Sequence, residues 1–246
     1  MLSKYEPVSY ELLCPEQVKA LREKCPIVYV PTGSLEWHGW HNPLGTDALK
    51  AQAICCEAAL KHGGVVLPPF YQGMVGTHNW GPEGWAGYTQ AFNEEDMFLS
   101  AMTGIARAMV FGGWNVIVGV TGHDHPIQRD AMQKAIDTVT EDTGATGFSI
   151  MEGELHEMND DIPYIMDHAA AWETSCMMYA YPGKVNLDAL KPHMVSTVDC
   201  LDIFGPEGIG GPDPLKYASP ELGRRIIERM GDLIGTKARE FLCFGI

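Results

Sequence analysis

IVYVPTGSLEWHGWHNPLGTD, residues 27–47, is the run from which the fold class can be predicted. Its first four residues are apolar and mostly β-branched, which is typical of a short buried strand. Val116 to Val120 forms a second such run, and the cluster His123-Asp124-His125 follows it. Because ligands of open α/β sheets bind beyond the carboxyl ends of strands, we expect the polar residues after both runs to form one site.

Four side chains of the metal-binding type follow the first run: Glu36, His38, His41 and Asp47. Just past a strand the backbone is still roughly extended, so Glu36 and His38 are expected to point to the same side. Asp47 opens the next helix, where backbone N–H groups can orient its carboxylate and keep it ionised. Imidazole nitrogen and carboxylate oxygen together suit Zn²⁺, and Mn²⁺ nearly as well. One carboxylate can also bridge two ions.

Strand-like and helix-like segments alternate along the chain. Expected helices span 14–24, 46–62, 94–111, 127–142, 166–181 and 220–241, and expected strands span 27–33, 65–69, 115–121 and 146–151. This alternation predicts an α/β fold with a mainly parallel β-sheet flanked by helices on both faces. Nothing in the 246 residues requires a second unit, so we expect a single domain over 1–246.

The composition restricts the class of partner. The formal net charge is −15, from 17 basic and 32 acidic residues, which argues against nucleic acid and anionic membranes because both attract clustered Lys and Arg. The seven cysteines form no CxxC pair, so reduced thiols in the cytoplasm are expected. No signal peptide and no run of 18 apolar residues is found. We expect a small-molecule substrate as the partner.

A third polar segment, HAAAWETS at 168–175, has two interpretations. His168 and Glu173 are five residues apart, which gives only approximate facing on a straight helix, and the alanines between them leave room for a substrate. The alternative is a packed helix N-terminus that Asp167 caps. Tryptophans lie in or beside these segments, and they either pack under loops or form an aromatic wall around a flat or cyclic substrate. Candidate substrate contacts are Trp40, His41, His78 and Trp172.

Three of these segments together resemble the creatininase (creatinine amidohydrolase) family. The family pattern P-x-G-S-x-E-x-H-G-x-H-L-P-x-x-T-D is similar to residues 31–47, and N-G-H-G-G-N is related to TGHDHP at 121–126. The pattern H-A-G-x-x-E-T-S is similar to residues 168–175. The resemblance covers about 25–240, most of the chain. It implies a three-layer sandwich with two Zn²⁺ or Mn²⁺ ions per subunit and a homo-oligomer, commonly a hexamer.

The resemblance also implies roles for single residues. Glu36, Asp47 and His123 would hold one ion, and His38 and Asp47 would hold the other. The remaining acidic ligand comes, in some relatives, from the position that is His125 here. We favour Glu173, which is intact. His168 would be the general acid/base, and Glu173 would also take part in catalysis.

The expected function follows from these roles. A metal-activated hydroxide would attack a carbonyl carbon and open or cleave a small cyclic amide, while His168 protonates the leaving atom. Asp124-His125-Pro126 departs from the family pattern, so the ring opening of a keto-inositol at a C–C bond is the alternative reaction. A non-catalytic metal-binding or ligand-binding relative is the alternative of another class. A dinucleotide-binding enzyme is disfavoured because no GxGxxG follows a strand.

Overall fold

The structure is a computed structural model that describes residues 3–74, 94–157, 167–191 and 207–244. Its sheet consists of β1 (Ile27–Thr32), β2 (Val65–Val66), β3 (Val116–Thr121) and β4 (Thr146–Met151). The strand order is β2-β1-β3-β4 and every pairing is parallel. Thr32 pairs with Thr121, and Thr121 pairs with Met151. The three longer strands therefore end at one level, and their polar continuations begin side by side.

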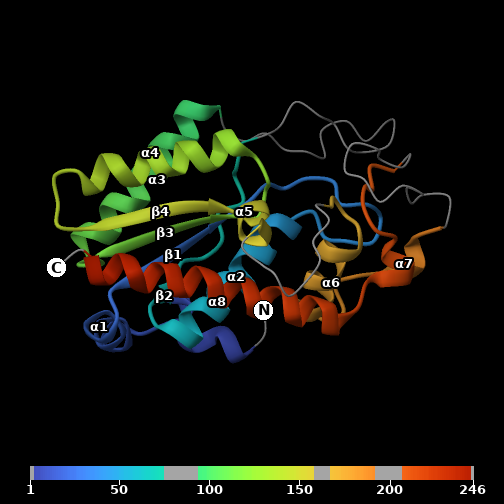
Figure 1. Cartoon of the computed structure of the whole chain (residues 1–246), viewed down its shortest axis with the longest axis horizontal. Helices are drawn as coiled ribbons and strands as arrows, with labels where there is room; N and C mark the ends of the chain where they lie inside the picture. Colours follow the sequence, from blue (N-terminus) through green and yellow to red (C-terminus); the bar gives the residue numbers. More distant parts are fainter. Residues whose placement is uncertain (1–2, 75–93, 158–166, 192–206, 245–246) are drawn as a thin grey trace.

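Helices cover both faces of this sheet (Figure 1). Their bounds are α1 Pro15–Lys24, α2 Thr46–His62, α3 Glu95–Phe111, α4 Pro126–Thr140, α5 Glu152–Glu157, α6 Ala171–Ala180, α7 Pro214–Tyr217 and α8 Pro220–Phe244. Short 3₁₀ turns occupy Ser3–Val8, Tyr10–Leu12 and Leu187–Ala189. In Figure 1, α3 and α4 lie on one side of the sheet and α2 and α8 on the other, while α6 and α7 lie beyond the strand ends. The predicted α/β class with a parallel sheet is confirmed.

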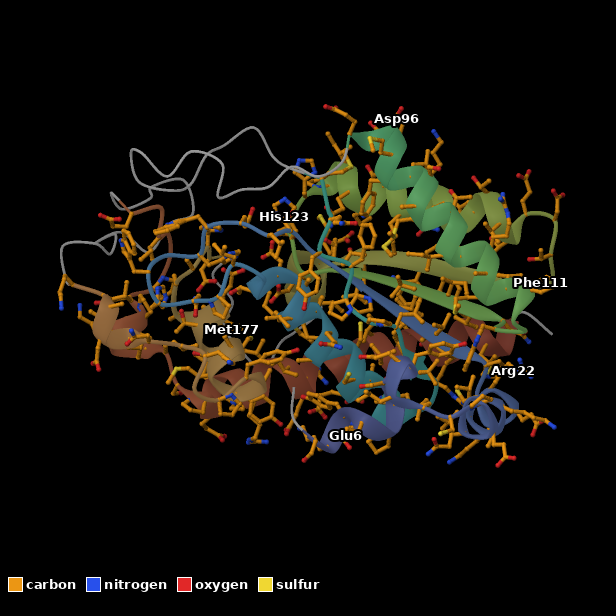
Figure 2. The ribbon with its side chains drawn as sticks, turned by 180° about the vertical axis from the view of Figure 1, so that it is seen from behind. Glu6, Arg22, Asp96, Phe111, His123 and Met177 are labelled. Atoms are coloured by element: carbon orange, nitrogen blue, oxygen red, sulfur yellow. The ribbon has the colours of Figure 1, made fainter. Side chains whose placement is uncertain are left out.

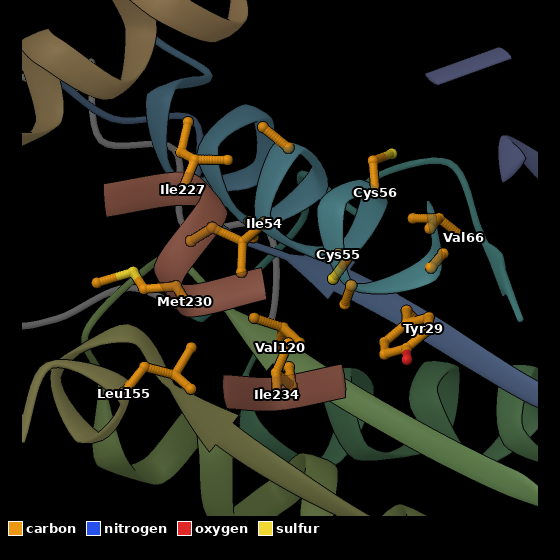
Figure 3. Close-up of a cluster of buried hydrophobic side chains, with 14 of the residues drawn as sticks. Tyr29, Ile54, Cys55, Cys56, Val66, Val120, Leu155, Ile227, Met230 and Ile234 are labelled. Carbon is orange, nitrogen blue, oxygen red and sulfur yellow. The ribbon is translucent and has the colours of Figure 1, made fainter. Parts of the chain in front are cut away.

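The core has two main parts, one on each face. On the side of α2 and α8, Ile54, Met230 and Ile234 pack toward Val120 of β3 (Figure 3). On the opposite face, Phe98 of α3 belongs to a second cluster with side chains of α4 and the central strands. Both faces of β1 and β3 are buried, which explains why these strands are almost continuously apolar rather than alternating.

Some boundaries differ from the prediction. The strand expected at 65–69 is only Val65–Val66, and a short helix, α5, follows β4 directly. The helix expected from 166 begins at Ala171, because His168 pairs with Gly210 in an antiparallel bridge and Ala169 has a φ of +55°. Neither geometry is compatible with a continuing α-helix. Within the described residues, no helix is both long enough and apolar enough to cross a membrane.

Candidate metal centre

The candidate site lies where β1 and β3 end and α2 begins. Figure 2 shows His123 at this end of the sheet, far from Phe111 and Arg22 at the other end. Two glycines let α2 approach: a Cβ on Gly33 would lie 2.3 Å from the backbone nitrogen of Ala48, and one on Gly122 would lie 2.2 Å from the carbonyl oxygen of Asp47. A side chain at either position would push α2 away. These close contacts place Asp47 directly beside the two strand ends.

Glu36, Asp47 and His123 form a first group of side chains that could hold a metal ion, with one potential ligand atom from each within 4.8 Å of the others. His123 Nδ1 lies 3.3 Å from Asp47 Oδ2 and 3.5 Å from Glu36 Oε2. All three side chains are buried. Two carboxylates and one imidazole make a donor set suited to Zn²⁺ or Mn²⁺.

His38, Asp47 and Glu173 form a second group within the same distance limit. His38 Nε2 lies 3.1 Å from Asp47 Oδ1 and 3.5 Å from Glu173 Oε2. His38 Nδ1 lies 3.1 Å from the carbonyl oxygen of Glu36, so an Nδ1–H donates there and Nε2 keeps a lone pair for an ion. Asp47 therefore turns one oxygen toward each group, which is the arrangement of a bridging carboxylate.

Buried polar atoms in this cluster are left without hydrogen bonds. Within the described residues, Glu36 Oε2, His38 Nε2 and His123 Nε2 are buried and have no hydrogen-bond partner. Unsatisfied buried polar atoms are costly and uncommon in native proteins. An ion coordinated by Glu36 Oε2 or His38 Nε2 would replace the missing partner. The residues present therefore fit a divalent metal.

Charges in the cluster are strongly coupled. Burial alone would lower the pKa of both imidazoles, but nearby carboxylates outweigh burial. Glu173 and Asp47 raise the pKa of His38 well above its ordinary value, and Glu36 and Asp47 raise the pKa of His123 to about 10. Burial would raise the pKa of Asp47, but His38 and His123 hold it well below its usual range. Without metal, protons occupy positions that an ion would take.

His168 lies beside both groups, but its pKa is shifted in the opposite direction from those of His38 and His123. Its Nε2 is 2.8 Å from the carbonyl oxygen of Trp37, and its Nδ1 is 3.6 Å from Glu36 Oε1. An Nε2–H that donates to Trp37 leaves Nδ1 as a proton acceptor facing the site. Burial and the charge of His38 lower the pKa of His168, so the ring is neutral at neutral pH. Glu36, His38 and His168 also form a third group that could hold an ion.

Of the two interpretations of the segment at 168–175, the structure shows the helix N-terminus that Asp167 caps, and room for a substrate stays a prediction. Asp167 accepts hydrogen bonds from the backbone of Trp172 at 2.6 Å and of Glu173 at 3.4 Å, so it caps the first turn of α6. The same turn directs Glu173 toward His38. The backbone N–H that approaches Asp47 belongs to Ser34, 3.4 Å from Oδ2, whereas we expected the N–H groups of the helix that Asp47 opens.

Other predicted site residues lie at the edge of the cluster or outside it. His125 belongs to none of the three groups; it caps α4, accepting from the backbone of Gln128 at 3.4 Å. Its ring stacks on His123 with centroids 5.6 Å apart. His41 Nε2 lies 2.9 Å from Thr174 Oγ1, and burial, aided by the charge of His38, lowers the pKa of His41 to about 4.

The two candidate tryptophans differ in their burial. Trp40 is 40% exposed, and its Nε1 donates to Glu207 Oε2 at 2.8 Å. Trp172 is 8% exposed and belongs to the core cluster of α2 and α8. His78 lies outside the described residues. Contact of these side chains with a substrate stays a prediction.

Sequence reasoning missed a buried cation beside the second group. Lys50, on α2, lies 2.5 Å from Glu152 Oε2 and 2.6 Å from Glu173 Oε1. These carboxylates outweigh burial and raise the pKa of Lys50 well above its ordinary value. The available signal was the helical spacing, since Lys50 follows Asp47 by about one turn and shares its face. Its burial could not be predicted from the sequence.

Comparison with known proteins supplies the remaining findings. A family model for creatininase, described as creatinine amidohydrolase, matches residues 11–236. A creatinine amidohydrolase of Pseudomonas putida is 25% identical over 231 residues, covering 87% of this chain and 89% of the relative. A 3-dehydro-scyllo-inosose hydrolase of Thermotoga maritima is 29% identical over 77 residues, covering 31% of this chain and 25% of the relative.

Solved structures share the fold. A mutant creatininase of the Zn-Zn type has a TM-score of 0.72 at 21% identity, covering 95% of this chain and 97% of that one. A creatininase described as the Mn form has a TM-score of 0.71 at 21% identity, covering 95% and 98%. At this level of identity the likeness establishes the α/β sandwich.

Proposed function

This chain belongs to the creatininase family, and on that premise we propose that it is a metal-dependent hydrolase that opens or cleaves a small cyclic amide. The shared carboxylate carries the proposal: Asp47 turns Oδ1 toward His38 and Oδ2 toward His123. A carboxylate that serves two adjacent ligand groups could hold two ions close together, as in a two-metal site.

The proposed cofactor is two ions of Zn²⁺ or Mn²⁺ per subunit. Glu36, Asp47 and His123 would hold one ion, and His38, Asp47 and Glu173 the other. The Zn-Zn and Mn forms of solved creatininases support this choice of metals. When bound, such ions make water nucleophilic near neutral pH and polarise a carbonyl group.

His168 is the proposed general acid/base. Its neutral ring can accept a proton at Nδ1 from the attacking water and return it to the leaving nitrogen. The hydrogen bond to Trp37 and the backbone bridge to Gly210 hold the ring in place. Its ring centroid lies 4.7 Å from that of His38, so any transferred proton stays close to the second group.

A C–C bond is the alternative target. The match to the 3-dehydro-scyllo-inosose hydrolase of Thermotoga maritima, which is named for a keto-inositol substrate, favours it. In that reaction the proton from His168 would go to carbon instead of nitrogen. A non-catalytic relative is disfavoured, because the side chains of both groups and His168 are all present.

Substrate profiling of the metal-loaded protein tests the proposal. The panel would contain creatinine, other five- and six-membered cyclic amides, and keto-inositols, with product detected by mass spectrometry as a gain of one water. Ring opening of an amide supports the proposal, and ring opening of keto-inositols alone supports the alternative. Protein with both ions bound but no turnover of any compound would favour the non-catalytic relative.

We also propose the setting in which the protein acts. It would act on a small molecule in the cytoplasm as a homo-oligomer, and the family resemblance makes a hexamer the expected state. Light scattering coupled to size-exclusion chromatography measures the subunit number, and a monomer at micromolar concentration would contradict this expectation.

A further inference from the structure

Lys50 is a buried cation that the proposed chemistry does not use. Its residue is only 2% exposed, although lysine is almost never fully buried unless it is paired. Its Nζ lies between Glu152 Oε2 and Glu173 Oε1, at 2.5 and 2.6 Å. Removing an ammonium from water is expensive, so the two carboxylates must offset that cost.

The contacts of Glu173 show what the ammonium does. Oε1 is engaged by Lys50, while Oε2 accepts the backbone N–H of Ala169 at 2.6 Å and lies 3.5 Å from His38 Nε2. Ala169 has a φ of +55°, a conformation that alanine rarely adopts. Each oxygen of the carboxylate therefore has a fixed direction, and only Oε2 faces the second group.

We propose that Lys50 is a positioning residue for the second group. Anchored by Glu152 at the start of α5, it holds Glu173 so that a single oxygen, Oε2, is presented beside His38. The inference rests on the proposed function, since the second group must hold an ion for this to matter. Within the described residues, Lys50 forms no hydrogen bond or ion pair with the first group. Its charge acts on that group only at longer range, through Asp47, so its effect should fall mainly on one ion.

The competing explanation is that Lys50 only neutralises buried carboxylates. Two variants separate these roles. Lys50→Met leaves Glu152 and Glu173 without their cation, which should destabilise the metal-free fold because uncompensated buried charge is costly. The double variant Lys50→Met/Glu152→Gln removes one positive and one negative charge, so the net charge of the pocket is restored while the contact to Glu173 stays absent.

Lys61→Met is a matched control on the same helix. Lys61 also pairs with a carboxylate, Asp232, at 2.7 Å, but 61% of its side chain is exposed. Exposed pairs of this kind contribute little to stability. Loss of a lysine from α2 as such should therefore affect neither metal binding nor melting.

The experiment titrates metal-free protein with Zn²⁺ against a competing chelator and records the metal-free melting temperature. We expect two ions in the wild type and in Lys61→Met. In both Lys50 variants the second ion should bind about 10–100-fold more weakly, the usual effect of removing a residue that orients a ligand, while the affinity for the first ion should change far less. The double variant should melt close to the wild type, which shows that the weakened binding is not a folding defect.

Several outcomes would overturn the role of Lys50. Wild-type affinity for both ions in Lys50→Met would do so. Recovery of both melting temperature and second-ion affinity in the double variant would also do so, because Lys50 would then only neutralise charge. A wild type that binds fewer than two ions contradicts the proposed binuclear function itself, and the inference falls with it.

Discussion

Replacing Gly122 with alanine should displace the helix that carries Asp47. An added Cβ would lie 2.2 Å from the carbonyl oxygen of Asp47 and 3.3 Å from the Cβ of Ala51. The φ of Gly122 is not positive, so alanine can adopt the backbone conformation and the effect is purely steric. The obstacle is backbone rather than a flexible side chain, and α2 or the turn after β3 must move.

The size of the effect follows from the overlap. Non-bonded heavy atoms rest about 3.5 Å apart, so the contact must open by roughly 1 Å. Overpacking of this kind typically costs about 1–3 kcal/mol of folding free energy. Misplacement by about 1 Å can also cost about 10²-fold in turnover. Because Asp47 belongs to both groups, both ions should bind more weakly.

Urea unfolding and metal titration of the variant measure both effects. Gly104→Ala is the control, since Gly104 is exposed in α3 and an added Cβ there meets nothing within 4 Å. That change should stabilise the protein by about 0.5–1 kcal/mol and leave metal binding intact. Gly122→Ala protein with wild-type stability and two tightly bound ions would show that close approach of α2 does not position Asp47.

Four further predictions concern the site itself. His168→Ala should lower turnover by about 10²–10⁴-fold, the usual contribution of a general acid or base, with both ions retained; loss of an ion would make His168 a ligand, as its place beside Glu36 and His38 permits. Asp47→Asn should empty both positions, and two ions per subunit in that variant would exclude a bridging role. Metal uptake at pH 7.5 should release about one proton per ion, because carboxylates hold the pKa of His38 well above its ordinary value and that of His123 at about 10 in the metal-free protein. The raised pKa of these imidazoles stabilises the metal-free fold below about pH 6.5, and that stability is lost as the pH rises toward 10. The increase in melting temperature that metal causes should therefore grow with pH. Calorimetry in buffers of different ionisation enthalpy counts the protons, and uptake without release would contradict these charge states.

The parallel sheet could be predicted because its signals are local. β1 and β3 are continuous apolar runs buried on both faces, and the polar residues after each run mark the strand ends. The convergence of Glu36, Asp47 and His123 follows from that topology, since parallel strands end at the same edge.

Other features depend on contacts that the sequence does not display. The late start of α6 is caused by the bridge between His168 and Gly210 and by the φ of Ala169, both of which are tertiary. In the sequence Lys50 cannot be distinguished from an exposed helical lysine, because the carboxylates that pair with it, Glu152 and Glu173, come from separate segments. Helical spacing places Lys50 on the face of Asp47, but its burial cannot be read from that spacing.

Elemental analysis of the wild-type protein, purified without chelator, tests most directly whether Asp47 serves two metal ions. One Asp47 turned toward both His38 and His123 predicts close to two equivalents of Zn or Mn per subunit. A single equivalent that does not increase when metal is added would contradict the binuclear centre. No bound metal, even after metal is added back, would contradict a metal-dependent hydrolase altogether.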